Sequence, residues 1–143
     1  MAVSAVSICN SALVKVGAER ILSLTDDNPR AQLMNEQYEK VRDELLYSHP
    51  WNFATKQSEL GLLSDAPTLD DFTAQFLLPS DCLRVTGTNL PGDSAWKIEG
   101  RKLLCNYDEI SIRYISNASD ASDYSPAFVE ALACKLAADV CFS

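Results

Sequence analysis

A proline at position 50 separates a long helical pattern from a segment in which aromatic side chains alternate with smaller ones. Before it, apolar residues recur at three- and four-residue intervals: Leu33, Met34, Tyr38, Val41, Leu45 and Leu46. Proline disfavours the helical conformation of its preceding residue, so we expect the helix to end near Ser48. Trp51, Phe53 and Thr55 then alternate as in a half-buried strand. The chain must therefore join a helical part to a sheet part at this corner.

The same spacing rules predict the remaining helices. Helical periodicity covers residues of about 3–16, 29–48 and 126–142. Gly17 is a natural residue to end the first helix. Asn28 followed by Pro29 favours the start of the second helix, and Ser125 followed by Pro126 favours the start of the third.

The β-rich part is expected over about residues 51–115. After residue 51, strand patterns are expected at 72–78, 82–88, 96–98, 103–105 and 110–115. The turns at 99–101 and 106–109 predict that the last three form a meander. We therefore expect an α+β fold with residues 1–143 as a single domain. Two N-terminal helices and a C-terminal helix form its helical module, and a small antiparallel β-subdomain occupies the middle of the chain.

Charge and composition narrow the function classes. The chain carries 12 basic and 20 acidic residues, a net charge of −8. This balance argues against broad phosphate neutralisation, and the basic residues form no stripe. No uncharged apolar run reaches the ~20 residues that span a bilayer, so no membrane role is expected. The five cysteines are odd in number and lack Cys-x-x-Cys spacing, which indicates buried free thiols in a reducing compartment.

The sequence offers little for catalysis. His49 is the single histidine, and its place at a helix end is explained by the helix dipole. Adjacent carboxylates at Asp26/Asp27, Asp70/Asp71 and Asp108/Glu109 read as solvated turn acids. A glycosidase needs two carboxylates that face one substrate, which neighbouring turn residues do not specify. We therefore predict no catalytic, cofactor-binding or metal-binding residues.

A second corner lies at residues 78–84, where a strand ends at Pro79 and Ser80 with Asp81 favours a turn. Asp81 and Arg84 are expected to pair with each other, or Arg84 with Asp43 or Glu44 of the second helix. A structural role is favoured, with a subunit interface as the alternative. Together with the first corner, this gives a predicted structural joint of Pro50, Trp51, Phe53, Asp81 and Arg84.

The last helix is apolar around most of its circumference, and only Glu130, Lys135 and Asp139 are charged in it. Such a helix is expected to be buried on several sides. We also expect either that the native chain continues beyond residue 143 or that a partner covers this end. The candidate interface residues are Arg42, Phe128, Leu132, Leu136 and Phe142.

Several segments, in order, carry a family resemblance: residues 9–13 with Gly17, 21–24, Ala31, Tyr38, 42–46, 50–54, 78–85 and 128–137. Together they resemble the tail tubular protein A family, the head-to-tail adaptor proteins of short-tailed bacteriophages. The resemblance covers nearly the whole chain, although no single motif in it is decisive. Family members usually carry further helical sequence after the last segment.

The resemblance implies a structural virion protein, assembled in the host cytoplasm, that forms a dodecameric ring under the portal protein. Such a ring would extend the DNA channel and join other tail proteins, and DNA would pass without specific binding. The acidic balance fits this, because a repelling wall lets DNA slide. One alternative is an acid-pair cell-wall or polysaccharide hydrolase, which predicts a cleft with two converging carboxylates. Another is a host-encoded interaction domain.

Overall fold

The computed structural model describes residues 3–69, 72–92 and 95–140. The chain divides into two compact units. One comprises Met1–Phe53 and Ala118–Ser143, and the other is the continuous segment Ala54–Asn117. Helices occupy the first unit and antiparallel strands the second, so the fold is α+β with the strands in the middle of the chain. The expected single domain is thus built of two units, which are described separately.

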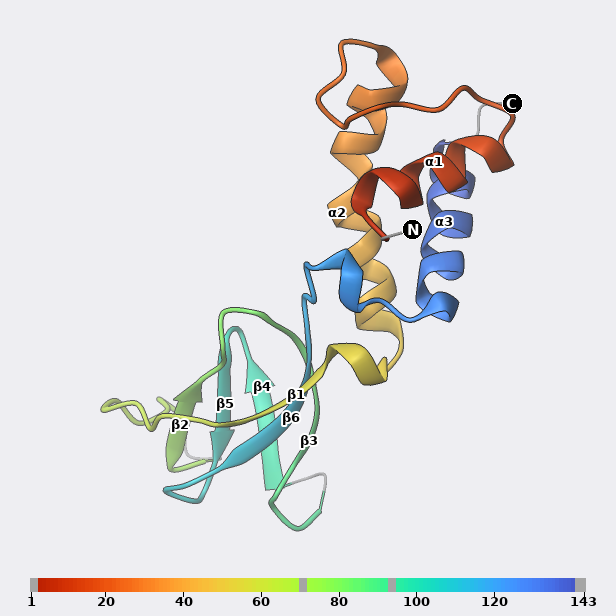
Figure 1. The fold of residues 1–143 in the computed structure, drawn as a ribbon. Coiled ribbons are helices and arrows are strands. Elements are labelled where there is room, and N and C mark those ends of the chain that lie inside the picture. The colour runs from red at the N-terminus through yellow and green to blue at the C-terminus, as the bar shows by residue number, and fades with distance from the viewer. Residues whose placement is uncertain (1–2, 70–71, 93–94, 141–143) are drawn as a thin grey trace. The chain divides into compact units, whose positions relative to one another are not determined.

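The helical unit contains α1 (Ala5–Lys15), α2 (Pro29–Ser48) and α3 (Pro126–Val140), as Figure 1 shows. α3 packs against both α1 and α2. The side chains buried in this unit include Ile8, Cys9, Leu13, Met34, Val41, Leu46, Phe128, Leu132 and Leu136. Within the described residues, none of these helices is long and apolar enough to cross a bilayer.

Local signals fix the helix ends, as the sequence predicts. Asn28 Oδ1 accepts a hydrogen bond from the Ala31 N–H at 2.9 Å and caps α2, with Pro29 as its first residue. Ser125 Oγ likewise accepts from the Phe128 N–H at 3.3 Å before α3. Gly17 follows α1 with φ of +76°, a left-handed conformation that suits glycine. At the start of α1, Ser4 and Ser7 bond each other's backbone N–H in a capping box that was not predicted from the sequence.

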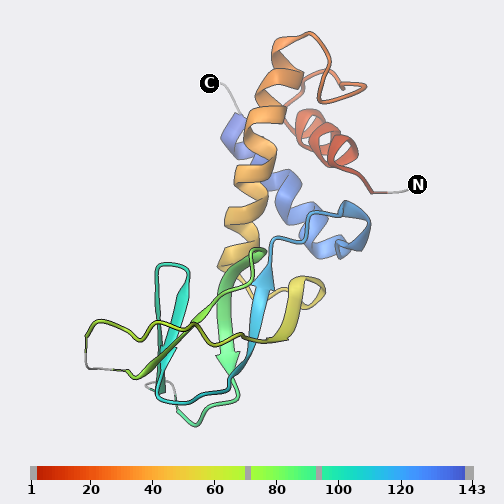
Figure 2. The same cartoon turned by 90° about the vertical axis from the view of Figure 1, so that its left-hand side faces the viewer.

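The strands of the second unit form two antiparallel sheets among the described residues. One sheet has the order β1-β6-β3, with β1 (Thr55–Glu59), β3 (Cys82–Thr88) and β6 (Ser111–Ser116). The other has the order β2-β5-β4, with β2 (Ala74–Leu77), β4 (Trp96–Glu99) and β5 (Lys102–Cys105). Figure 2 shows them from the side.

The expected meander over 96–115 is wrong at its second step. β4 and β5 do form a hairpin, turned at Gly100 with φ of +60°. β6, however, lies between β1 and β3 in the other sheet. The physical reason is burial: Ile112 and Tyr114 enter one core with Phe76 and Leu103 from the opposite sheet. Residues 106–110 therefore cross between sheets and do not turn back.

The predicted strand at Trp51–Thr55 is also wrong in its first half. Asn52–Ala54 forms a short 3-10 helix, and β1 starts at Thr55. Asn52 is exposed, and the rings of Trp51 and Phe53 both reach Phe128 of α3. A 3-10 turn brings both aromatics onto one partner. These contacts with Phe128 outweigh the tendency of the alternating residues to form a strand.

Candidate functional site

The aromatic part of the predicted joint lies in the helical unit, around Phe128. The Phe128 ring meets Trp51, Phe53 and Tyr124 at centroid distances of 5.0, 4.9 and 4.8 Å, each edge to face. Such geometry suits the quadrupoles of aromatic rings. Trp51 and Phe53 were predicted as joint residues. Tyr124 was not, because its only signal is its place just before Ser125-Pro126.

Trp51 also closes the end of α2. Its indole Nε1 donates a hydrogen bond to the Leu45 carbonyl at 3.0 Å, one of the carbonyls that the helix end leaves without a partner in the helix. Pro50 precedes it and is exposed. The His49 ring lies against the indole at a centroid distance of 4.8 Å. The corner is thus a helix cap combined with an aromatic cluster.

A buried polar group lies beside this cluster. The hydroxyl-bearing rings of Tyr38 and Tyr124 and the guanidinium of Arg42 are all buried. Burial raises the pKa of both tyrosines, so their phenols stay protonated. Arg42 Nε donates to Asp43 Oδ1 at 3.0 Å. Arg42 is therefore held inside the unit by a carboxylate, which compensates the cost of burying its charge.

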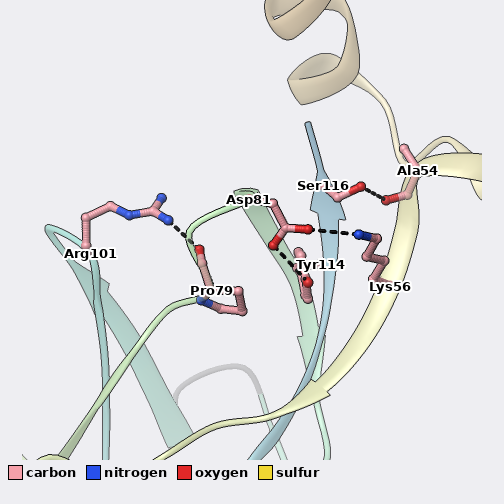
Figure 3. Close-up of polar contacts among 7 residues, drawn as sticks. All are labelled: Ala54, Lys56, Pro79, Asp81, Arg101, Tyr114 and Ser116. Carbon is pink, nitrogen blue, oxygen red and sulfur yellow. Dashed lines mark hydrogen bonds and ion pairs between the residues drawn. The ribbon is translucent and has the colours of Figure 1, made fainter. Parts of the chain in front are cut away.

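The other two joint residues, Asp81 and Arg84, belong to the β unit. Figure 3 shows that the Asp81 carboxylate is held from two sides: Lys56 Nζ lies 2.9 Å from Oδ2, and Tyr114 Oη donates to Oδ1 at 3.1 Å. Tyr114 lies on β6, which pairs with β3, the strand that follows Asp81, and Lys56 lies on β1, on the other side of β6. Asp43 and Glu44 were the suggested partners of Arg84. In the structure, Asp43 pairs with Arg42 at 3.0 Å, and Glu44 pairs with Lys135 at 3.7 Å.

These contacts determine the direction in which the pKa values of Asp81 and Tyr114 shift. Burial acts to raise the pKa of Asp81, but the hydrogen bonds from Lys56 and Tyr114 outweigh it and leave the pKa lowered. The pKa of Tyr114 is raised to about 12 by burial and by the hydrogen bond to the Asp81 carboxylate. Asp81 is therefore a bound carboxylate at neutral pH, whereas a general acid requires a raised pKa.

Arg101, which was not predicted as a site residue, forms hydrogen bonds with the same turn. Arg101 donates from Nη2 to the Pro79 carbonyl at 2.5 Å, as Figure 3 shows. It also donates from Nη1 to the Cys82 carbonyl at 2.8 Å. Arg101 follows Gly100 in the β4–β5 hairpin, so these bonds fasten one sheet to the chain that enters the other. The Ser116 hydroxyl also donates to the Ala54 carbonyl at 3.0 Å. The turn at Asp81 therefore has a structural role within this unit.

The candidate interface residues lie mostly inside the helical unit. Phe128, Leu132 and Leu136 are fully buried, and Arg42 is buried too. α3 turns its three residues toward α1 and α2, so these side chains pack within the unit, and their role in an interface between subunits stays a prediction. The exposed strip of α3 is instead formed by Ala127, Glu130, Cys134 and Ala138. Phe142, the remaining candidate, lies outside the described residues.

The cysteine prediction holds for three of the residues that the structure describes. Cys9, Cys82 and Cys105 are buried free thiols, and burial raises the pKa of Cys9 to about 12. Cys134 is exposed, contrary to expectation, because α3 presents it beside Glu130. Cys141 lies outside the described residues. A thiol with a raised pKa is a poor nucleophile, so Cys9 has a packing role.

Among the turn acids that the structure describes, Asp26 has a structural role. Asp26 accepts from the backbone N–H groups of Leu22 and Ser23, which fixes the connector before α2. Asp70 and Asp71 lie outside the described residues. Hydrogen bonds lower the pKa of Asp120 and Glu130, through Ser122 and Lys15 respectively. Among the described residues, no group of three or more His, Cys, Asp or Glu side chains has the arrangement of a metal site.

The sequence matches no protein-family model and no curated protein.

Proposed function

We propose that this chain is a structural virion protein, the head-to-tail adaptor of a short-tailed bacteriophage. It assembles as a dodecameric ring under the portal protein, extends the DNA channel and receives other tail proteins. The observation that carries the proposal is the ordered set of resembling segments, which runs through both units of the fold. The proposal places the protein in the connector of the virion, after assembly in the host cytoplasm.

The positions of the resembling segments support this reading. Residues 9–13 lie on α1, 42–46 on α2 and 128–137 on α3, where each supplies buried side chains. Residues 78–85 form the turn that Asp81 and Arg101 hold in place. All these contacts stabilise a fixed scaffold. An adaptor needs such a scaffold, because its function depends on keeping its binding surfaces in position.

The charge balance also supports the proposal. A net charge of −8 repels a DNA phosphate backbone, so a ring of such subunits would not retain the DNA that moves through it. A basic lumen in the assembled ring would contradict this part of the proposal.

Light scattering with and without the portal protein of the same virus tests the function. We expect the protein to bind the portal and to increase the mass of the complex by many copies. A protein that stays a monomer and never binds the portal would refute the proposal. A muralytic or glycosidase assay on the same sample distinguishes the hydrolase alternative, which requires activity without the portal.

A further inference from the structure

A groove opens on the surface of the helical unit between α1 and α3, with a volume of about 510 Å³. The side chains that form it include Ser7, Ser11, Val14, Lys15, Arg20 and Glu130. Ser7, Ser11 and Val14 lie one helical turn apart on the exposed side of α1. The two serines are small enough for another helix to approach closely, and Val14 offers it an apolar contact.

The groove is locally cationic in an acidic chain. Lys15 Nζ lies 2.6 Å from Glu130 Oε1, so that acid is already paired. Arg20 is exposed and forms no ion pair or side-chain hydrogen bond with any described residue. Two cations therefore face one carboxylate here, although the chain as a whole has a net charge of −8. An acidic partner surface is the complement.

The outer face of α2 carries such a surface. Glu36 and Glu39 are exposed, lie one turn apart, and form no ion pair with any described residue. Like charges at this spacing repel each other, so a cation from a partner would relieve them. Lys40 is exposed beside them, but the two acids outnumber it.

The same copy cannot bring these two surfaces together. The buried side chains of α2, such as Met34 and Val41, are part of the helical core, so Glu36 and Glu39 point out of it. Figure 2 looks onto the side of α2 that is turned away from α3. The groove formed by α1 and α3 therefore meets an α2 outer face only from another molecule.

We infer that the α1–α3 groove binds the outer face of α2 from a second copy of this chain, with Arg20 and Lys15 facing Glu36 and Glu39. The occupant is a helix in a groove, a common mode of recognition. Because the two surfaces differ, the contact is head to tail, and its repetition closes into a ring or extends as a filament. This inference rests on the proposed function and specifies its subunit contact.

Charge exchange tests the contact by sedimentation velocity over a range of protein concentrations. Arg20→Glu alone makes both surfaces acidic, and Glu36→Lys with Glu39→Lys makes both basic. We expect each variant to lose the self-association of the unmodified protein, by at least tenfold in the association constant. An equimolar mixture of the two variants should recover it, as should one chain that carries all three substitutions.

Lys102→Glu, an exposed site on β5, is the matched control and should associate like the unmodified protein. Unchanged association in the groove and α2 variants would overturn the inference, as would failure of the mixture to recover. An unmodified protein that stays monomeric at every concentration would overturn it as well. Portal binding tests the proposed function separately. If the protein binds the portal but its self-association is unchanged in the charge variants, only the proposed contact is refuted.

Discussion

The indole of Trp51 contacts both the end of α2 and the start of α3. It packs on Phe128 and donates to the Leu45 carbonyl. Trp51→Ala removes both contacts, and we expect a loss of about 3 kcal/mol in the free energy of unfolding, since the ring is half buried. Trp51→Phe keeps an aromatic ring and should cost only about 1 kcal/mol for the lost hydrogen bond. Urea unfolding measures both, and equal losses would contradict the capping role.

Asp81 makes the stability of the β unit depend on pH. Its pKa is lowered in the folded chain, so its contribution is fully present above the ordinary carboxyl pKa. That contribution is lost as pH falls through the lower folded pKa. We expect Asp81→Asn to be less stable than the unmodified protein at pH 7 and to approach its stability in acid. Urea titrations at several pH values measure this, and a difference that stays constant with pH would contradict it.

The end of α1 depends on one residue with a left-handed backbone. An added Cβ at Gly17 would meet no atom within 4 Å, so any cost of Gly17→Ala comes from its φ of +76°. We expect a loss of about 1 kcal/mol in unfolding free energy. Gly61→Ala is the control, because Gly61 has equal space and no positive φ, and it should be close to neutral. Thermal unfolding of the two variants measures both stability changes. Equal losses of stability would contradict an origin in the left-handed backbone of Gly17.

The helices and strands differ in how well sequence alone placed them. The bounds of α2 and β3 were predicted correctly because their signals are local: a cap, a proline, and strand residues bounded by turns. The start of β1 was missed because contacts with Phe128, far away in sequence, decide the path of residues 51–54. Leu22 is exposed although it is apolar, whereas its neighbour Ile21 is buried and its backbone is hydrogen-bonded by Asn10.

Because the chain divides into two compact units, we expect each unit to unfold as its own cooperative block. Phe76 is fully buried in the β unit, and Phe76→Ala should destabilise that unit by about 3–5 kcal/mol. Native-state hydrogen exchange should then show faster exchange at β5 and β6, with much smaller changes at α2 and α3. Leu132→Ala in α3 is the reciprocal variant. Equal acceleration in both units would mean that the chain unfolds as one block.

The sequence by itself determined the fold class, the bounds of α2, the start of α3 and the turn at Gly100, because periodicity, caps and turn residues act over a few neighbouring positions. Only the tertiary structure decided that β6 pairs with β1 and β3, that Lys56 and Tyr114 hold Asp81, and which side of α3 is exposed. Each of these depends on residues distant in the chain. Their meeting is selected by burial and by hydrogen-bond satisfaction in the folded units, which no local pattern encodes.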